Sequence, residues 1–329
     1  KTNAKEIIRL AKLNSNTPSH ESKIATTILA SHPSSKEGYE TSEQILKTML
    51  TEFKDSDPNN YKNNDEKYFI LLGLKQIYLK QSKFKLSETY AQQALNWIIE
   101  RSPKLYANQI ALKTDIADLL VKQGKMSEAK IAYQDLLASS KQFYGENSRG
   151  HLNVVMNYGV FLSDIKMFEK ALTVQQQALK IAVKLYGHLN ELTVTIKINI
   201  SVILKDTQKL AEAEALMRST LIDARKVLGD NHTTVLILEL NFADLLNQQQ
   251  KYQEAEKLAR INVEKLSIKL GKRHFITLMS QTMLARSISS QNRYRESEDL
   301  YSKTFSDILE TQTIKSPYTQ SVLQNYIEH

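Results

Sequence analysis

Lys209-Leu210-Ala211-Glu212-Ala213 returns 42 residues later as Lys251-Tyr252-Gln253-Glu254-Ala255. The large apolar residue in the second place of this pattern keeps the same spacing along most of the chain, at Phe84, Met126, Phe168, Leu210, Tyr252 and Tyr294. A fixed period in this range is typical of stacked supersecondary units, each of which buries its apolar face against its neighbours. The sequence therefore predicts a repeat array rather than closed globular domains.

A small residue follows each of these apolar residues three positions later, giving the series Ser87, Ala129, Ala171, Ala213, Ala255 and Ser297. In a helix, positions three apart share a face, and a small side chain there lets a neighbouring helix approach closely. A second small series lies twelve positions earlier, at Ala117, Gly159, Ser201, Ala243 and Ala285. Each repeat thus contains two helices, a first one called helix A and a second one called helix B. The link between them is so short that they can form only an antiparallel hairpin.

Glycine ends each helix B at the same period, at Gly145, Gly187, Gly229 and Gly271. We expect these glycines to take the left-handed cap position and the polar residues after them to cap the next helix A. The capping candidates are Ser148, Asn190, His232 and His274. A metal site at the two histidines is disfavoured, because equivalent places in successive repeats lie about 10 Å apart, too far for one ion.

This pattern resembles the tetratricopeptide repeat, and Leu-Gly-x-x-His-x-x-Thr after helix B is similar to the kinesin light chain subtype of that repeat. The closest matches are residues 228–234 and 270–277. The resemblance implies an all-α fold, a right-handed α-solenoid of antiparallel helix pairs with about six regular repeats and a degenerate one before them. Residues 1–64 would be an N-terminal helical cap with room for that degenerate repeat, 65–312 the array, and 313–329 a C-terminal capping helix. Lys75 at a small position and Pro103 at a glycine position depart from the pattern and weaken the first repeat.

The composition narrows the classes of function. The chain has no Cys, which excludes disulfides, thiolate catalysis and cysteine-based zinc sites. No phosphate loop, nucleophile elbow, zinc-protease His pair or spaced carboxylate dyad occurs in a supporting context, so we expect no catalytic residue, cofactor or metal, and no enzyme. A net charge of +8 favours a negatively charged partner, and it leaves an acidic protein, nucleic acid and an anionic membrane surface as alternatives. Nucleic acid is not expected, because the basic run 257–273 lacks interleaved aromatic residues and is more typical of a solvated helix face.

The sequence leaves more than one cellular compartment as an alternative. No apolar stretch approaches the ~18 residues that a membrane span requires, so direct membrane insertion is not expected. The missing start Met and the absence of Cys fit an exported or periplasmic protein, while a cytoplasmic one is slightly favoured.

A column of polar residues marks the candidate binding surface on the A helices. One position of helix A is occupied in successive repeats by Asp115, Asn157, Asn199, Asn241 and Met283, which are spaced 42 residues apart. An amide carries both a donor and an acceptor, so such a column pairs with the main chain of an extended peptide whatever its side chains. The resemblance implies this role for the Asn residues, in a concave groove formed by the A helices. An alternative is that these amides bridge adjacent helices and hold the superhelical twist.

The sequence thus favours a protein- or peptide-binding scaffold that holds an extended partner segment in its concave groove. Residues expected near the Asn column are Asn153, Thr195, Lys205, Asp244 and Arg286. Two alternatives are a ligand-sensing regulatory domain of a larger, membrane-anchored bacterial regulator and a self-assembly module. The expected partner is a protein or peptide of acidic character, and an oligomer of this chain is left open.

Overall fold

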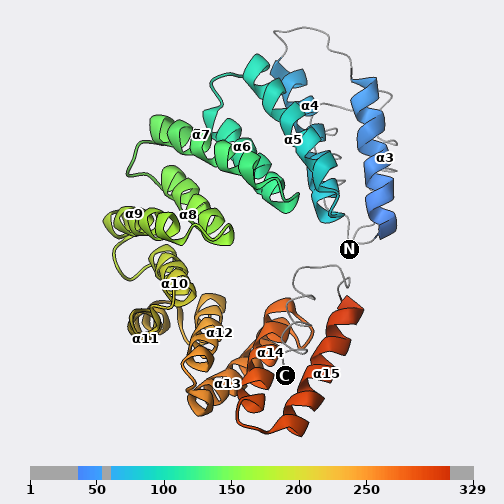
Figure 1. Cartoon of the computed structure of the whole chain (residues 1–329). Coiled ribbons are helices and arrows are strands. Elements are labelled where there is room, and N and C mark those ends of the chain that lie inside the picture. Colours follow the sequence, from blue (N-terminus) through green and yellow to red (C-terminus); the bar gives the residue numbers. More distant parts are fainter. Residues whose placement is uncertain (1–35, 54–60, 312–329) are drawn as a thin grey trace. The chain divides into compact units, whose positions relative to one another are not determined.

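The computed structural model describes residues 36–53 and 61–311, in which all regular secondary structure is helical (Figure 1). The chain divides into two compact units, residues 1–146 and 147–329. The predicted capping helix at 313–329 and most of the N-terminal cap lie outside the described residues. The first unit contains α3 (Lys36–Glu52), α4 (Tyr61–Lys80), α5 (Phe84–Arg101), α6 (Tyr106–Lys122) and α7 (Met126–Tyr144). The second unit contains α8 (Arg149–Asp164), α9 (Phe168–Tyr186), α10 (Glu191–Asp206), α11 (Leu210–Leu228), α12 (Thr233–Gln248), α13 (Tyr252–Leu270), α14 (Phe275–Ser289) and α15 (Tyr294–Thr311).

The helices pair as the 42-residue period predicts. Each helix B begins at an apolar residue of the series that runs from Phe84 to Tyr294, so α5, α7, α9, α11, α13 and α15 are the B helices. The small residues three positions later are all at most 3% exposed, because the preceding helix A packs directly over them. The predicted all-α solenoid of antiparallel helix pairs is therefore confirmed. None of the described helices combines the length and the apolar character needed to cross a bilayer.

The turn after each helix B uses a backbone conformation different from the expected one. At Gly145, Gly187, Gly229 and Gly271, φ lies between 79° and 96° and ψ between 153° and 179°. The prediction of a left-handed cap, with ψ near about +47°, was therefore wrong. The chain leaves the helix in an extended mirror-image conformation that is essentially restricted to glycine. A Cβ at any of the four would meet nothing within 4 Å, so the backbone conformation, not lack of space, requires glycine.

The turn between helix A and helix B does hold a left-handed residue. Its φ is 57–75° at positions 82, 124, 166, 208, 250 and 292, and glycine occupies only position 124 among these. The following N–H bonds back to a carbonyl near the end of helix A, as from Lys251 to Leu246 at 2.9 Å. This bond closes the helix as in a Schellman cap. Residues such as Gln250 therefore hold a conformation that is unfavourable for a side chain.

The two turn types predict opposite effects of glycine substitutions on stability. Introducing a glycine should stabilise the turn between helix A and helix B, and removing the glycine after helix B should destabilise the fold. Gln250→Gly should raise the free energy of unfolding by about 0.5–1 kcal/mol, because glycine relieves the left-handed conformation. Gly229→Ala should lower it by about 1–3 kcal/mol, because alanine is strained in the extended mirror-image region. Urea denaturation of the two variants measures both changes. Destabilisation by Gln250→Gly would contradict the strain assigned to that turn.

The polar residues after the glycines cap the A helices, as predicted. Ser148 and Asn190 each accept a hydrogen bond from a backbone N–H in the first turn of the helix that follows. His232 and His274 do the same through Nδ1, at 3.3 Å. The histidines therefore stabilise helix starts. Within the described ranges, no group of three His, Asp or Glu side chains is placed to hold a metal ion.

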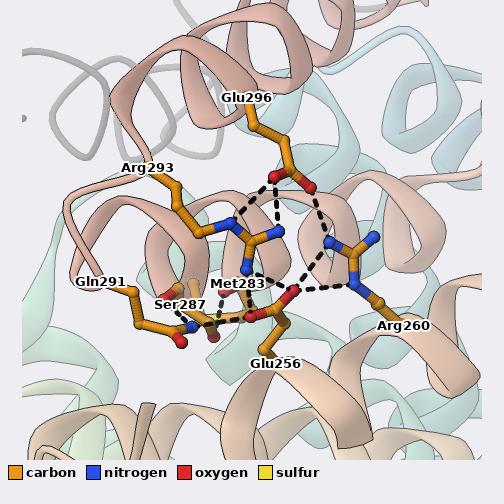
Figure 2. A network of polar contacts seen from close by, with 7 residues as sticks. All are labelled: Glu256, Arg260, Met283, Ser287, Gln291, Arg293 and Glu296. Carbon is orange, nitrogen blue, oxygen red and sulfur yellow. Dashed lines mark hydrogen bonds and ion pairs between the residues drawn. The ribbon is translucent and has the colours of Figure 1, made fainter. Parts of the chain in front are cut away.

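A charged network joins helix B of one repeat to the turn of the next (Figure 2). Glu256 on α13 accepts hydrogen bonds from Arg260 at 2.7 Å, from Gln291 at 2.7 Å and from Arg293 at 2.8 Å. Glu296 on α15 accepts from the same two arginines, at 2.6 Å for Arg260. Single surface ion pairs contribute little, but a network in which each carboxylate holds several donors fixes the spacing of successive repeats.

Half of the six basic residues in the run 257–273 have an acidic partner among the described residues. Arg260 belongs to the network just described, Lys265 lies 3.5 Å from a Glu239 oxygen, and Arg273 lies 2.8 Å from Asp307. Lys269 donates to the backbone carbonyl of Asn231 at 2.7 Å. These paired residues of the run therefore stabilise the packing of neighbouring helices, whereas a purely solvated helix face was predicted.

The same network recurs one repeat earlier and predicts a pH effect. Hydrogen bonds from Lys251 and Arg218 hold the pKa of Glu214 at about 2, well below its ordinary value of 4.5. A depressed carboxyl pKa stabilises the fold above the unfolded value, and this stability is lost as pH falls from about 4.5 to about 2. Glu214→Gln should cost roughly 1 kcal/mol at pH 7 and nothing near pH 2.

Thermal unfolding of Glu214→Gln across this pH range measures the effect. The matched control is Glu212→Gln, because Glu212 is exposed on the same helix turn and has no ion pair within residues 61–311. An equal loss of stability in both variants at pH 7 would contradict the role of the Glu214 contacts.

A buried polar cluster holds the core of the second unit. Glu239 on α12 is 0% exposed and accepts from Arg225 at 2.7 Å and from Asn262 at 3.1 Å. Lys265 lies 3.5 Å from the same carboxylate, and Ser280 on α14 donates to the Asn262 carbonyl at 2.8 Å. A buried carboxylate is stable only when its oxygens are paired, so this cluster links α11, α12, α13 and α14 in one register.

Candidate functional site

A groove of about 290 Å³ opens on the A helices of the second unit. It is lined by residues of α8, α10 and α12, which are the A helices of three successive repeats, and by Gln175 from α9. Of the predicted site residues, Thr195 and Asn199 on α10 and Asn241 on α12 line it. The 42-residue period places them together because equivalent positions of stacked hairpins face the same side.

The amides of the Asn column are free of internal partners. None of the side-chain amides of Asn157, Asn199 and Asn241 forms a hydrogen bond within the ranges 36–53 and 61–311. Asn157 is exposed, whereas Asn199 and Asn241 are half-buried in the groove wall. The alternative role, bridging adjacent A helices, is therefore not what these side chains do. Both the donor and the acceptor of each amide are available to a bound molecule.

Three other predicted residues do not line the groove. Asn157 and Asn153 lie exposed on α8, and the groove begins at Gly159 two residues after Asn157. Asp115 lies on α6 in the first unit, where its carboxylate accepts a hydrogen bond from Lys75 of α4. Lys75 occupies the position where later repeats have a small residue, so this ion pair belongs to the irregular first repeat.

The predicted charged residues pair with one another instead of standing free. Lys205 on α10 donates to Asp244 on α12, whose other oxygen lies 3.2 Å from Arg286 on α14. These contacts tie three consecutive A helices together. Lys205, Asp244 and Arg286 are absent from the residues that line the groove, so its charge is set by other side chains.

The groove has an apolar floor and one charged residue among its lining. Val160, Ile198, Val202 and Ile237 supply the apolar surface, and Val160 is 41% exposed. Asp164, at the end of α8, supplies the charge. Partial desolvation of the Asp164 carboxyl group raises its pKa, although one side of the residue remains exposed to solvent.

Gln175 enters this wall from helix B because Gly159 has no side chain. A Cβ on Gly159 would lie 2.6 Å from Gln175 Nε2, closer than packed atoms allow. The fully buried Gln175 donates from Nε2 to the carbonyl of Met156 at 3.1 Å, while its Oε1 has no partner among the residues described. Gly159 and Gln175 are thus a matched pair that places an amide side chain in the groove wall, with its unpartnered oxygen covered.

Gln175 is not among the predicted site residues because it lies on helix B, outside the predicted groove. The equivalent positions of other repeats carry apolar or aromatic residues, at Ala91, Tyr133, Met217, Ala259 and Tyr301. Gln175 is the one amide in this buried series, and Gly159 is the one glycine in the small series of the A helices. These two exceptions in the same repeat were the sequence signal for the site.

The chain matches a known repeat family by sequence. Residues 193–234, one full period, match the tetratricopeptide repeat. A search of curated protein sequences finds no match.

Solved structures with the same fold cover most of the chain. BtubC from P. vanneervenii is 15% identical with a TM-score of 0.56, covering 68% of this chain and 89% of its own. An array of nearly identical TPR-like repeats from Podosopora anserina, named for kinesin light chain, is 17% identical with a TM-score of 0.52, covering 63% and 98%. NprR in complex with its cognate peptide NprX is 12% identical with a TM-score of 0.56, covering 94% and 82%. At these identities the likeness concerns the fold.

Proposed function

We propose that this chain, in which residues 193–234 match the tetratricopeptide repeat and whose fold is like that of kinesin light chain arrays, is a protein-interaction scaffold. Its groove on α8, α10 and α12 holds an extended peptide segment. The observation that carries the proposal is that the amides of Asn199 and Asn241 line the groove with no internal partner. The donor and the acceptor of each amide are open to a ligand in the groove, and a peptide main chain supplies a matching acceptor and donor.

The size and chemistry of the groove support the same function. A volume of about 290 Å³ suits a few peptide side chains, and the apolar floor is suited to aliphatic ones. NprR, which has the same fold, is solved in complex with its cognate peptide NprX. We propose no catalysis for this chain, since a mostly apolar groove with a single carboxylate offers no pair of acid and base.

The proposal also changes the expected partner. The net charge of +8 favoured an acidic one, but the lysines near the groove are engaged: Lys197 lies 2.9 Å from Asp223, and Lys205 binds Asp244. The free charge at the groove is the negative one of Asp164. A neutral or basic segment therefore suits the groove better than an acidic one. A ligand-sensing regulatory domain would use the same groove, with the peptide as its signal.

Selection of random linear peptides on the immobilised chain tests this function. Peptides recovered should lose binding to Ile237→Glu, which puts a charge on the groove floor, and keep binding to Ile222→Glu. Ile222 is the matched control because it is 70% exposed on α11 of the same unit, away from the groove. Equal binding to both variants, or no enrichment of any peptide by the folded chain, would sink the proposal.

A further inference from the structure

One carboxylate at the groove lacks the cation that its equivalent in the next repeat has. Asp164 forms no ion pair within residues 36–53 and 61–311, whereas Asp206, 42 residues later, lies 3.5 Å from Lys205. Asp164 is an exposed residue, but partial desolvation raises the pKa of its carboxyl group, and no neighbouring positive charge lowers it. An unpaired carboxylate at the end of a mostly apolar groove favours a bound group that carries positive charge.

The Asp164 carboxylate is one hydrogen-bond acceptor at the groove, and the side-chain amide of Gln175 supplies a second. The hydrogen bond from its Nε2 to the Met156 carbonyl fixes the orientation of the amide, so the opposite atom of the group is the acceptor Oε1. This buried oxygen has no hydrogen bond in the structure as described. The Gln175 side chain lines the groove because Gly159 leaves room for it there. The oxygen itself is covered in this structure, so bonding to it requires a small shift of the side chain. Nothing in the fold of the other repeats requires an amide at this place, since Met217 and Ala259 fill it in the next two.

Two acceptors, one of them charged, select a group that carries only donors and a positive charge. Guanidinium and ammonium groups have this property, because neither has an acceptor. The apolar floor at Val160 and Val202 is suited to the aliphatic stem of a long basic side chain. We propose that the groove recognises a cationic group of the bound segment, a Lys or Arg side chain or a free amino terminus, through Asp164 and Gln175. This inference rests on the proposed peptide-binding function.

The test uses peptides selected on the full chain by display. Each cationic group is neutralised separately, with citrulline for Arg, norleucine for Lys and an acetyl group for the amino terminus, and affinity is measured by calorimetry. One neutralisation should weaken binding about tenfold or more to the unaltered chain and have no effect on Asp164→Asn, since a charge-assisted hydrogen bond is then already lost. The position that shows this coupling identifies the source of the cation.

Two further variants separate the site from general effects. Gln175→Met should weaken the same peptides about fivefold, as expected for loss of one hydrogen bond, and Met217 shows that the fold accepts Met at this register. Asp206→Asn, in the same register one repeat later and outside the groove lining, should leave affinity unchanged. Peptides that need Asn199 and Asn241 but show no coupling to Asp164 would overturn the cation site and leave the proposed function standing. Failure of every peptide to bind the folded chain would overturn both.

Discussion

Asn262→Ala should lower the free energy of unfolding by about 3 kcal/mol, because it breaks the buried polar cluster of the second unit. The substitution removes the donor that holds one oxygen of the buried Glu239 and the acceptor that receives the Ser280 hydroxyl. Both groups are 0% exposed, and each unsatisfied buried polar group costs about 1–3 kcal/mol. The cluster links four helices, so urea denaturation followed by circular dichroism will report the change.

The control for this prediction is Thr220→Ala, the equivalent position one repeat earlier. Thr220 is also 0% exposed, but its hydroxyl makes no hydrogen bond to the described residues, so its loss should cost less than about 1 kcal/mol. If the two variants lose the same stability, the cost comes from lost packing and not from the Glu239 cluster.

The second large effect concerns binding. The double variant Asn199→Ala with Asn241→Ala should weaken display-selected peptides about 100-fold, because two amides, each able to form a donor and an acceptor bond to the peptide main chain, are lost. Since neither amide has an internal partner, the fold itself should lose little stability. Fluorescence anisotropy with labelled peptides measures the affinity, and thermal unfolding checks the fold.

The matched control removes two amides from the opposite side of the same unit. Gln176→Ala with Gln177→Ala changes exposed residues of α9, which lie outside the groove lining. This control variant should bind the display-selected peptides with the same affinity as the unaltered chain. Loss of binding in the control, or unchanged binding in the Asn variant, would show that the amides of the column do not hold the peptide.

The period of the sequence was sufficient to predict the helical framework. The apolar residue that opens each helix B and the small residue three positions later determine where two helices meet, and both are read directly from Phe84 to Ser297. The capping residues were predictable for a similar reason, since Asn190 and His232 act within their own turn. Helix ends and close helix contacts recur in every repeat together with the residues that cause them. They can therefore be predicted from the 42-residue period of the sequence.

Features that differ between repeats were not predictable in this way. The A–B ion pair of one repeat joins Lys197 to Asp223, and the next reverses the charges, with Glu239 and Lys265 at the same places. The pairing of Lys205, Asp244 and Arg286 also depends on three different repeats. Such contacts depend on distances between neighbouring hairpins, which the period alone leaves undetermined. The placement of Gln175 similarly depends on a glycine in a different helix.

The structure of the full chain bound to a display-selected peptide tests the central claim most directly. We predict an extended peptide that crosses α8, α10 and α12, with main-chain hydrogen bonds to the side-chain amides of Asn199 and Asn241. A peptide bound on the B helices, or one that leaves both amides without a partner, would contradict it.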